Sequence, residues 1–152
     1  MVDAAAAARL IPMDALDLDD AMEAEVDDLL REGLVVWLTT VTPTGQPQTS
    51  PVWYHWDGHT FLVFSQPGQP KLANIAANPR VSLHPVGAPD AEDAVTIEGT
   101  AALDPSAPPC DQIPEYITKY LERIDYLEWT PASFAEDYSV ALRVTPTRFR
   151  IL

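Results

Sequence analysis

The spacing of hydrophobic residues changes at Gly33, from a helical period before it to strand-like runs after it. Residues 17–33 carry an apolar stripe at helical spacing, opposite a face of acidic residues, and predict an amphipathic helix. The stripe consists of Met22, Val26, Leu29 and Leu30. Residues 1–16 are rich in alanine and poor in large side chains, which predicts a flexible N-terminal arm. One folded domain is therefore expected over residues 17–152.

After Gly33 the pattern is that of short β-strands. β-Branched and aromatic residues fill six runs, which are separated by turns and loops rich in glycine, proline or aspartate. The expected strands are residues 34–42, 46–56, 59–65, 80–87, 94–103 and 138–152, the last being one strand or two strands broken near Pro146. Pro47 and Pro51 lie inside the second run. Since proline has no N–H to donate to a neighbouring strand, this strand should lie at a sheet edge or carry a bulge.

Helical spacing returns in two later places. Residues 71–78 predict a short helix that ends before Pro79, and residues 113–129 predict a longer one, with a further turn over residues 131–136. These helices do not alternate with the strands, so a doubly wound parallel sheet is not expected. The pattern predicts a mainly β protein, an antiparallel barrel with helices at its periphery.

Composition and charge narrow the class of partner. The chain has 152 residues, of which 47% are hydrophobic, and these values suit one globular domain. Nine basic residues stand against 23 acidic ones, for a net charge of −14. Nucleic acid and anionic membrane surfaces need clustered basic residues, so neither is expected as a partner. No apolar run approaches the ~20 residues of a membrane helix, and no secretory signal is recognised. A cytoplasmic protein is expected.

Metal binding and nucleophilic catalysis are not indicated. His55, His59 and His84 lack the close spacing of metal ligands, and Cys110 stands alone in a proline-rich connection. No serine lies in a G-x-S-x-G elbow. Tyr54 and His55 are conceivable proton donors, but ring contact or core packing is the preferred interpretation of each. No metal site and no catalytic side chain is therefore predicted.

The chemically informative stretch is the loop over residues 66–70 and the helix that follows it. This loop, rich in glycine and proline, delivers Lys71 to the helix start, where free N–H groups and the ammonium favour an anion such as phosphate. Ser65 and Gln69 are candidate neutral donors beside it. In the second strand, Pro51 leaves nearby backbone groups free, so a flat heteroaromatic ring can lie there. A surface lysine and an ordinary edge strand remain open as alternatives.

Several short motifs follow one another along the chain in a recognisable order. They are Thr40, Gly45-Gln46-Pro47-Gln48, Ser50, Val52, Tyr54-His55-Trp56-Asp57, Lys71-x-x-Asn74, Asn78-Pro79-Arg80-Val81-Ser82-Leu83, Tyr138-Ser139-Val140 and Arg143-Val144-x-Pro146-Thr147-Arg148. In this order they resemble the flavin-binding split barrels, the relatives of pyridoxamine-phosphate oxidase, over residues 34–152. Within that family the chain is most similar to the branch that uses the deazaflavin coenzyme F420.

The resemblance implies a six-stranded antiparallel split β-barrel of the FMN-binding type, a homodimer, and cofactor sites between the subunits. It implies that Lys71 holds the cofactor phosphate and that the backbone of residues 50–53 borders the ring. The predicted cofactor-binding residues are Ser50, Pro51, Val52, Trp53, Ser65, Gln69, Lys71, Leu72 and Asn74. Gln69 stands where many relatives carry an arginine, which predicts weaker phosphate binding or a replacement cation such as Arg148 or Arg150.

The expected function is an oxidoreductase in which reduced coenzyme F420 passes a hydride to a small unsaturated organic substrate. Two alternatives remain open, namely the same barrel holding FMN, or a non-catalytic protein that stores or carries the cofactor. Oxidation of pyridoxamine phosphate is not expected, because no basic cluster is left over for a second phosphate.

Overall fold

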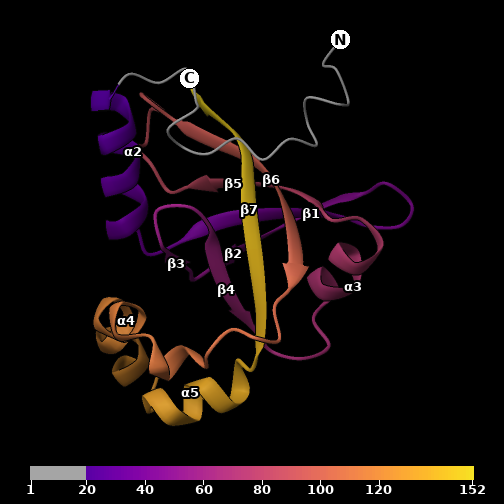
Figure 1. Ribbon diagram of the computed structural model, residues 1–152, viewed down its shortest axis with the longest axis vertical. Coiled ribbons are helices and arrows are strands. Elements are labelled where there is room, and N and C mark those ends of the chain that lie inside the picture. The colour runs from indigo at the N-terminus through magenta and orange to yellow at the C-terminus, as the bar shows by residue number, and fades with distance from the viewer. Residues whose placement is uncertain (1–19) are drawn as a thin grey trace.

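The computed structural model describes residues 20–152 (Figure 1). The predicted arm over residues 1–16 and the predicted beginning of the first helix lie outside this range. The first described helix, α2, covers Asp20–Glu32 and buries Val26 and Leu30 of the expected stripe. No helix within residues 20–152 is both long and apolar enough to cross a membrane.

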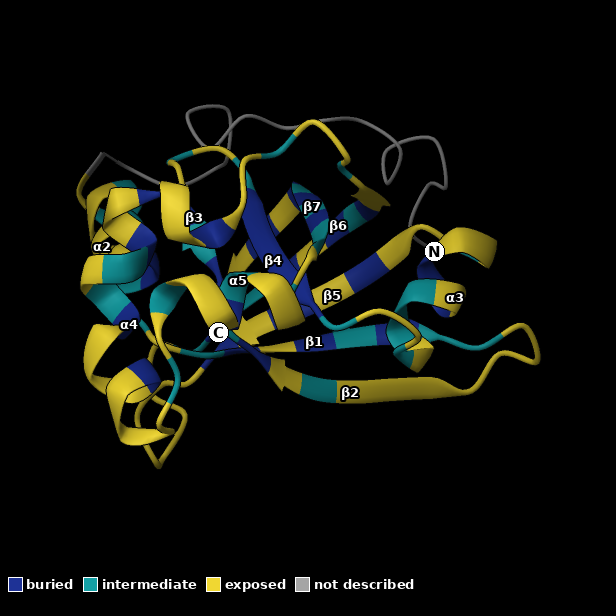
Figure 2. Ribbon diagram, turned by 90° about the horizontal axis from the view of Figure 1, so that it is seen from below, coloured by how far each residue is buried: buried dark blue, intermediate teal, exposed yellow. Residues whose placement is uncertain are grey.

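The strands of the described range form one antiparallel sheet. They are β1 (Val36–Val41), β2 (Pro47–Val52), β3 (His55–Trp56), β4 (Phe61–Ser65), β5 (Arg80–Pro85), β6 (Val95–Leu103) and β7 (Val140–Ile151). Their order across the sheet is β2-β1-β5-β6-β7-β4-β3, and every neighbouring pair is antiparallel. The sheet curls into an open barrel with helices at its periphery (Figures 1 and 2). This arrangement confirms the predicted mainly β split-barrel fold.

The predicted second strand, residues 46–56, is divided between the two edges of the sheet. β2 ends at Val52 on one edge, and β3 begins at His55 on the other. Trp53 and Tyr54 link them, and the backbone N–H of Tyr54 donates to the hydroxyl of Tyr120 at 2.9 Å instead of to a strand. The division raises the number of strands in the described range to seven and leaves the predicted architecture unchanged.

Proline is tolerated in this sheet where the ladder does not need its N–H. Pro47 and Pro51 lie in β2, which pairs only with β1, so the prediction of an edge strand is confirmed. β7 runs unbroken through Pro146, because its register against β6 shifts between Glu98 and Gly99. Gly99 allows this close approach, since a Cβ there would lie 2.7 Å from the carbonyl oxygen of Thr145.

Two clusters of buried side chains divide the interior. The first fills the barrel and is closed by α2 and by Ile75 of α3 (Pro70–Ala77). The second lies between β4 and a helical cap made of η2 (Cys110–Gln112), α4 (Pro114–Tyr126) and α5 (Pro131–Asp137). We call residues 110–137 the cap. Figure 1 shows the cap at the end of the sheet where β4 finishes and β7 begins.

Candidate functional site

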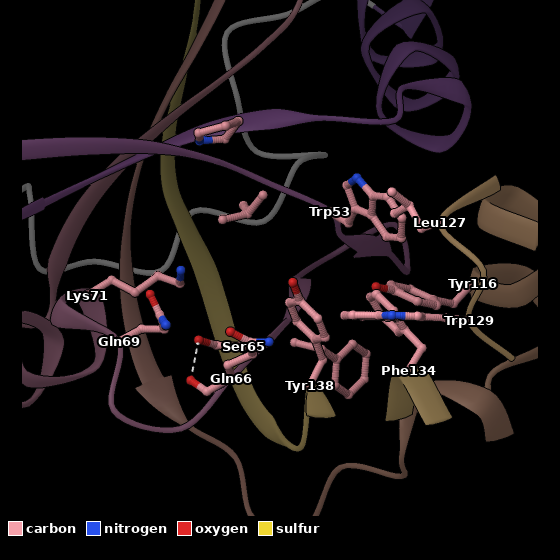
Figure 3. A pocket seen from close by; sticks show the side chains of 13 residues that line it. Trp53, Ser65, Gln66, Gln69, Lys71, Tyr116, Leu127, Trp129, Phe134 and Tyr138 are labelled. Atoms are coloured by element: carbon pink, nitrogen blue, oxygen red, sulfur yellow. Dashed lines mark hydrogen bonds between the residues drawn. The ribbon is translucent and has the colours of Figure 1, made fainter. Parts of the chain in front are cut away.

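A cavity of about 250 Å³ opens between β2, the end of β4 and the cap. We call it the cleft. One end of its lining is polar, and the other is aromatic (Figure 3). The polar end is formed by Ser65, Gln66, Gln69 and Lys71, and the aromatic end by Trp53, Phe64, Tyr116, Leu127, Trp129, Phe134 and Tyr138, with Pro51 and Val52 along the β2 side.

Lys71 is the charged group of the polar end. It is half-buried on α3, and burial lowers the pKa of its ammonium. Within residues 20–152 it makes no hydrogen bond and no ion pair. A partly desolvated ammonium without an opposite charge fits an anionic group, which would restore the lost electrostatic stabilisation. The residues present are therefore suited to a phosphate.

The start of α3 offers fewer neutral donors than the sequence suggests. Pro70 is the first helical residue and has no N–H, and the N–H of Leu72 donates to the Gln69 carbonyl at 3.0 Å. The Ser65 hydroxyl donates to the Gln66 carbonyl at 2.9 Å. The Gln69 side chain does not cap the helix, so its amide is free to act beside the Lys71 ammonium.

A second hollow, of about 430 Å³, adjoins the cleft at Lys71. Gln69 and Lys71 line both spaces, and the rest of the second lining is Thr40, Gln48, Thr49, Ser50 and Pro70. Neither lining, as far as the described residues form it, includes an aspartate or glutamate, although the chain has 23 acidic residues. An anion that extends beyond Lys71 therefore meets no lining carboxylate there.

The structure brings six of the nine predicted cofactor-binding residues together in the cleft. They are Pro51, Val52, Trp53, Ser65, Gln69 and Lys71. Ser50 lines the second hollow, and Leu72 packs against the barrel core. Asn74 is buried, and its side-chain nitrogen donates to Thr40 Oγ1 at 3.0 Å and to Gln48 Oε1 at 2.9 Å. Asn74 thus braces the β1–β2 pair.

The other candidates from the sequence lie away from the cleft. Arg150 pairs with Glu98 at 3.3 Å on the exposed face of the sheet, and Arg148 lines neither hollow. The Tyr54 hydroxyl donates to the Leu30 carbonyl at 2.7 Å inside the barrel. His55 lines a separate hollow beside Lys119, and burial lowers the pKa of its imidazole.

Neither metal-ligand clusters nor a reactive thiol is found in the described range. No group of three or more His, Cys, Asp or Glu side chains within residues 20–152 is arranged to hold a metal ion. Burial raises the pKa of the Cys110 thiol to about 11, which keeps it protonated at neutral pH.

Apart from Trp53, the aromatic end is the part of the site that the sequence did not predict. Its rings form a continuous wall, with Trp53 and Phe134 stacked at 5.3 Å and Phe134 and Tyr138 stacked at 4.4 Å between centroids. Trp129 packs against both Phe134 and Tyr138. Six aromatic residues fall within residues 116–138, and this local density is the signal that would have pointed to a ring-lined surface.

Two side chains of α4 hold the link between β2 and β3 in place. The Tyr120 hydroxyl accepts the Tyr54 N–H at 2.9 Å and donates to the Leu34 carbonyl at 2.7 Å. Lys119 Nζ donates to the Tyr54 carbonyl at 3.3 Å and lies 3.9 Å from the centroid of the Tyr54 ring. Burial lowers the pKa of Lys119 to about 8. The cap therefore fixes the segment that carries Trp53 into the cleft.

Comparison with known proteins identifies the family. A sequence profile described as pyridoxamine 5'-phosphate oxidase matches residues 22–152. Comparison with curated protein sequences found no match.

Three solved structures illustrate the range of proteins with this fold. The conserved hypothetical protein Rv2991 from Mycobacterium tuberculosis is 21% identical, with a TM-score of 0.68 over 90% of this chain and 85% of that chain. A protein described as F420 reductase is 27% identical, with a TM-score of 0.58 over 82% of this chain and 94% of that chain. HutZ, described as a heme storage protein from Vibrio cholerae, is 16% identical, with a TM-score of 0.61 over 85% of this chain and 93% of that chain. Fold similarity alone therefore does not select the ligand.

Proposed function

Because this chain belongs to the pyridoxamine 5'-phosphate oxidase family, we propose that it is an oxidoreductase that binds the deazaflavin coenzyme F420 at Lys71. When bound, the reduced deazaflavin would supply a hydride for a small unsaturated organic substrate. The observation that carries this proposal is the half-buried Lys71, without a counter-charge in the described range, at the junction of two hollows.

The two hollows favour a cofactor that extends in both directions from its phosphate. In the proposed binding mode Lys71 anchors the phosphate, and the backbone of residues 51–53 borders the ring in the cleft. The anionic tail of the deazaflavin then follows the second hollow, where the lining side chains from the described range carry no negative charge. FMN ends at its phosphate and makes no use of that second space. The F420 reductase at 27% identity is consistent with the same choice.

The chain's own residues have binding and shielding roles in this proposal. Lys71 and Gln69 hold the anion, and Trp53, Phe134 and Tyr138 keep water away from the ring. No side chain is assigned as a catalytic acid or base. Tyr54 and His55 are no longer candidates, since neither lines the cleft.

The runner-up is FMN in the same cleft, followed by a protein that carries a cofactor without turnover. FMN is favoured by the family, and its phosphate would use the same Lys71 ammonium. A carrier role is consistent with a storage protein of the same fold, although at 16% identity that similarity concerns the fold alone.

Titration of the purified protein with each cofactor, followed by fluorescence, tests the proposal. We expect coenzyme F420 to bind at least about tenfold more tightly than FMN, a difference of about 1.4 kcal/mol. Tighter binding of FMN would favour the runner-up. Tight binding of F420 without reduction of any unsaturated acceptor would favour the carrier.

We also propose that the protein is a homodimer formed through the outer face of the sheet. Trp37 of β1 is 37% exposed on that face and stacks on His84 of β5 at 6.5 Å. The resemblance to the split barrels, which implies cofactor sites between two subunits, supports self-association through this face. An obligate interface buries more than roughly 2,000 Å² in total, so sedimentation should find a dimer at micromolar concentration. A monomer under those conditions would contradict this proposal.

A further inference from the structure

The Tyr116 hydroxyl is an almost completely buried polar group that has no partner among the described residues. Tyr116 is only 1% exposed, and no hydrogen bond within residues 20–152 involves its hydroxyl. Every wholly buried side-chain nitrogen or oxygen in that range has a hydrogen-bond partner. The Tyr116 hydroxyl is therefore not wholly buried, and the opening that reaches it is the cleft, which Tyr116 lines. Figure 3 shows its oxygen on the side of the ring that faces Tyr138.

The surroundings of this hydroxyl are aromatic. The Tyr116 ring packs edge-on against Phe64 at 5.3 Å and in a tilted arrangement against Tyr120 at 4.7 Å between centroids. Burial raises the pKa of Tyr116 well above its ordinary range, so the hydroxyl keeps its proton and acts as a donor at neutral pH. Tyr138 presents a second hydroxyl at the same end, also without a hydrogen bond to a described residue.

A largely desolvated hydroxyl without a protein partner costs free energy that a ligand can recover. The aromatic end accepts a flat ring, because its wall consists of aromatic rings and Leu127, and none of the described side chains in that wall is charged. We propose that the aromatic end of the cleft binds an uncharged planar substrate, and that the Tyr116 hydroxyl donates a hydrogen bond to an acceptor oxygen on its ring. That this ligand is a substrate rests on the proposed function, whereas the ring-binding site follows from the described residues alone.

Two small bicyclic probes that differ only in the acceptor test this site. They are 1-indanone, which has a ring ketone, and indane, the corresponding hydrocarbon. We would titrate each into the purified protein without cofactor and follow binding by ligand-observed NMR. The wild type should bind the ketone more tightly than the hydrocarbon. Tyr116→Phe should weaken ketone binding about tenfold and leave hydrocarbon binding unchanged.

Tyr126→Phe is the matched control, because Tyr126 lies on the same helix and is 83% exposed. It should change neither affinity. The melting temperature of Tyr116→Phe should equal or exceed that of the wild type, since the substitution removes an unpartnered hydroxyl from apolar surroundings. A clear fall in melting temperature would mean that the hydroxyl has a structural partner, and the proposal would be overturned.

Three further results would overturn it. One is equal binding of the two probes by the wild type, and another is an equal loss of both in Tyr116→Phe. The third is a loss of F420 or FMN affinity in Tyr116→Phe as large as its loss of ketone affinity. That result would assign the hydroxyl to the cofactor ring. Because the probe titration contains no cofactor, failure of F420 to bind would count against the proposed function and leave the probe result intact.

Discussion

The two ends of the cleft are built from different parts of the chain and work by different physical means. The polar end comes from the end of β4, the following loop and the start of α3, and depends on one ammonium. The aromatic end comes mainly from the cap, where the rings that line the cleft also join the cap to β4. A substitution at the polar end should therefore change binding and spare the fold, whereas loss of a whole ring at the aromatic end should change stability first.

The largest effect is expected from Phe134→Ala in the cap. Phe134 is 3% exposed and packs on Trp53, Trp129 and Tyr138. Removing this ring should lower the free energy of unfolding by about 3–5 kcal/mol, as measured by urea denaturation. Tyr126→Ala, on the exposed side of the cap, should change it by less than about 0.5 kcal/mol. Similar losses in the two variants would mean that ring packing does not hold the cap.

Lys71→Ala makes the opposite test at the polar end. Loss of a charge-assisted contact should weaken F420 binding roughly ten- to a hundredfold, or about 1.5–3 kcal/mol. The urea midpoint should not fall, because Lys71 has no hydrogen bond or ion pair with a described residue.

Arg123→Ala provides the control for charge, since Arg123 is exposed on α4 and lines neither hollow. The chain's other lysine, Lys119, is unsuitable because it contacts Tyr54. Equal loss of F420 affinity in Lys71→Ala and Arg123→Ala would point to a general charge effect and would remove Lys71 from the site.

The polar end could be predicted from the sequence because its determinants are local. The edge position of β2 follows from Pro47 and Pro51, and the placement of Lys71 follows from the loop that precedes its helix. Most of the strands and helices follow in the same way from periodicity and turn residues. What the local pattern overestimated was the number of free donors at the start of α3, where Leu72 turns its N–H to Gln69.

The aromatic end could not be predicted in this way because its determinants are distant in sequence. The division of the second strand depends on a hydrogen bond between Tyr54 and Tyr120, which are 66 residues apart. Periodicity predicts the helix over residues 113–129, but it contains no information on which surface the buried face of that helix covers. The same limit applies to Tyr116, because its position in the sequence gives no indication of the cleft that it lines.

Tyr120→Phe, which removes a single hydroxyl from the cap, should cause a smaller loss of stability than Phe134→Ala. The substitution keeps the ring and leaves the buried Tyr54 N–H and the Leu34 carbonyl without this partner. Such unsatisfied groups cost about 1–3 kcal/mol, which should appear as a lower urea midpoint. Tyr126→Phe should leave the midpoint unchanged, since Tyr126 is 83% exposed. A Tyr120→Phe variant as stable as the wild type would show that packing alone holds the Trp53–Tyr54 link.

A last effect, confined to alkaline pH, is a pH dependence of stability that comes from Lys119. Its pKa is lowered from 10.5 to about 8 in the folded protein, by burial. Between these two values the unfolded chain binds more protons than the folded chain, so this residue's contribution to stability rises with pH. Below about pH 8 both states are protonated, and the contribution is constant. The sign is opposite to that of Tyr54, Tyr116 and Tyr120, whose pKa values burial raises, so that they lower stability at alkaline pH.

Comparison of the wild type with Lys119→Met isolates this contribution, because the tyrosines are common to both proteins. The difference in free energy of unfolding, wild type minus variant, should rise as the pH is raised above about 8 and should be flat below it, in urea titrations at each pH. A difference that stays flat or falls above that pH would mean that the Tyr54 ring and carbonyl stabilise the ammonium enough to offset its burial. Lys119 would then have partners within the fold that compensate its charge, whereas Lys71 has no hydrogen bond or ion pair with a described residue and would gain such a partner only from a bound anion.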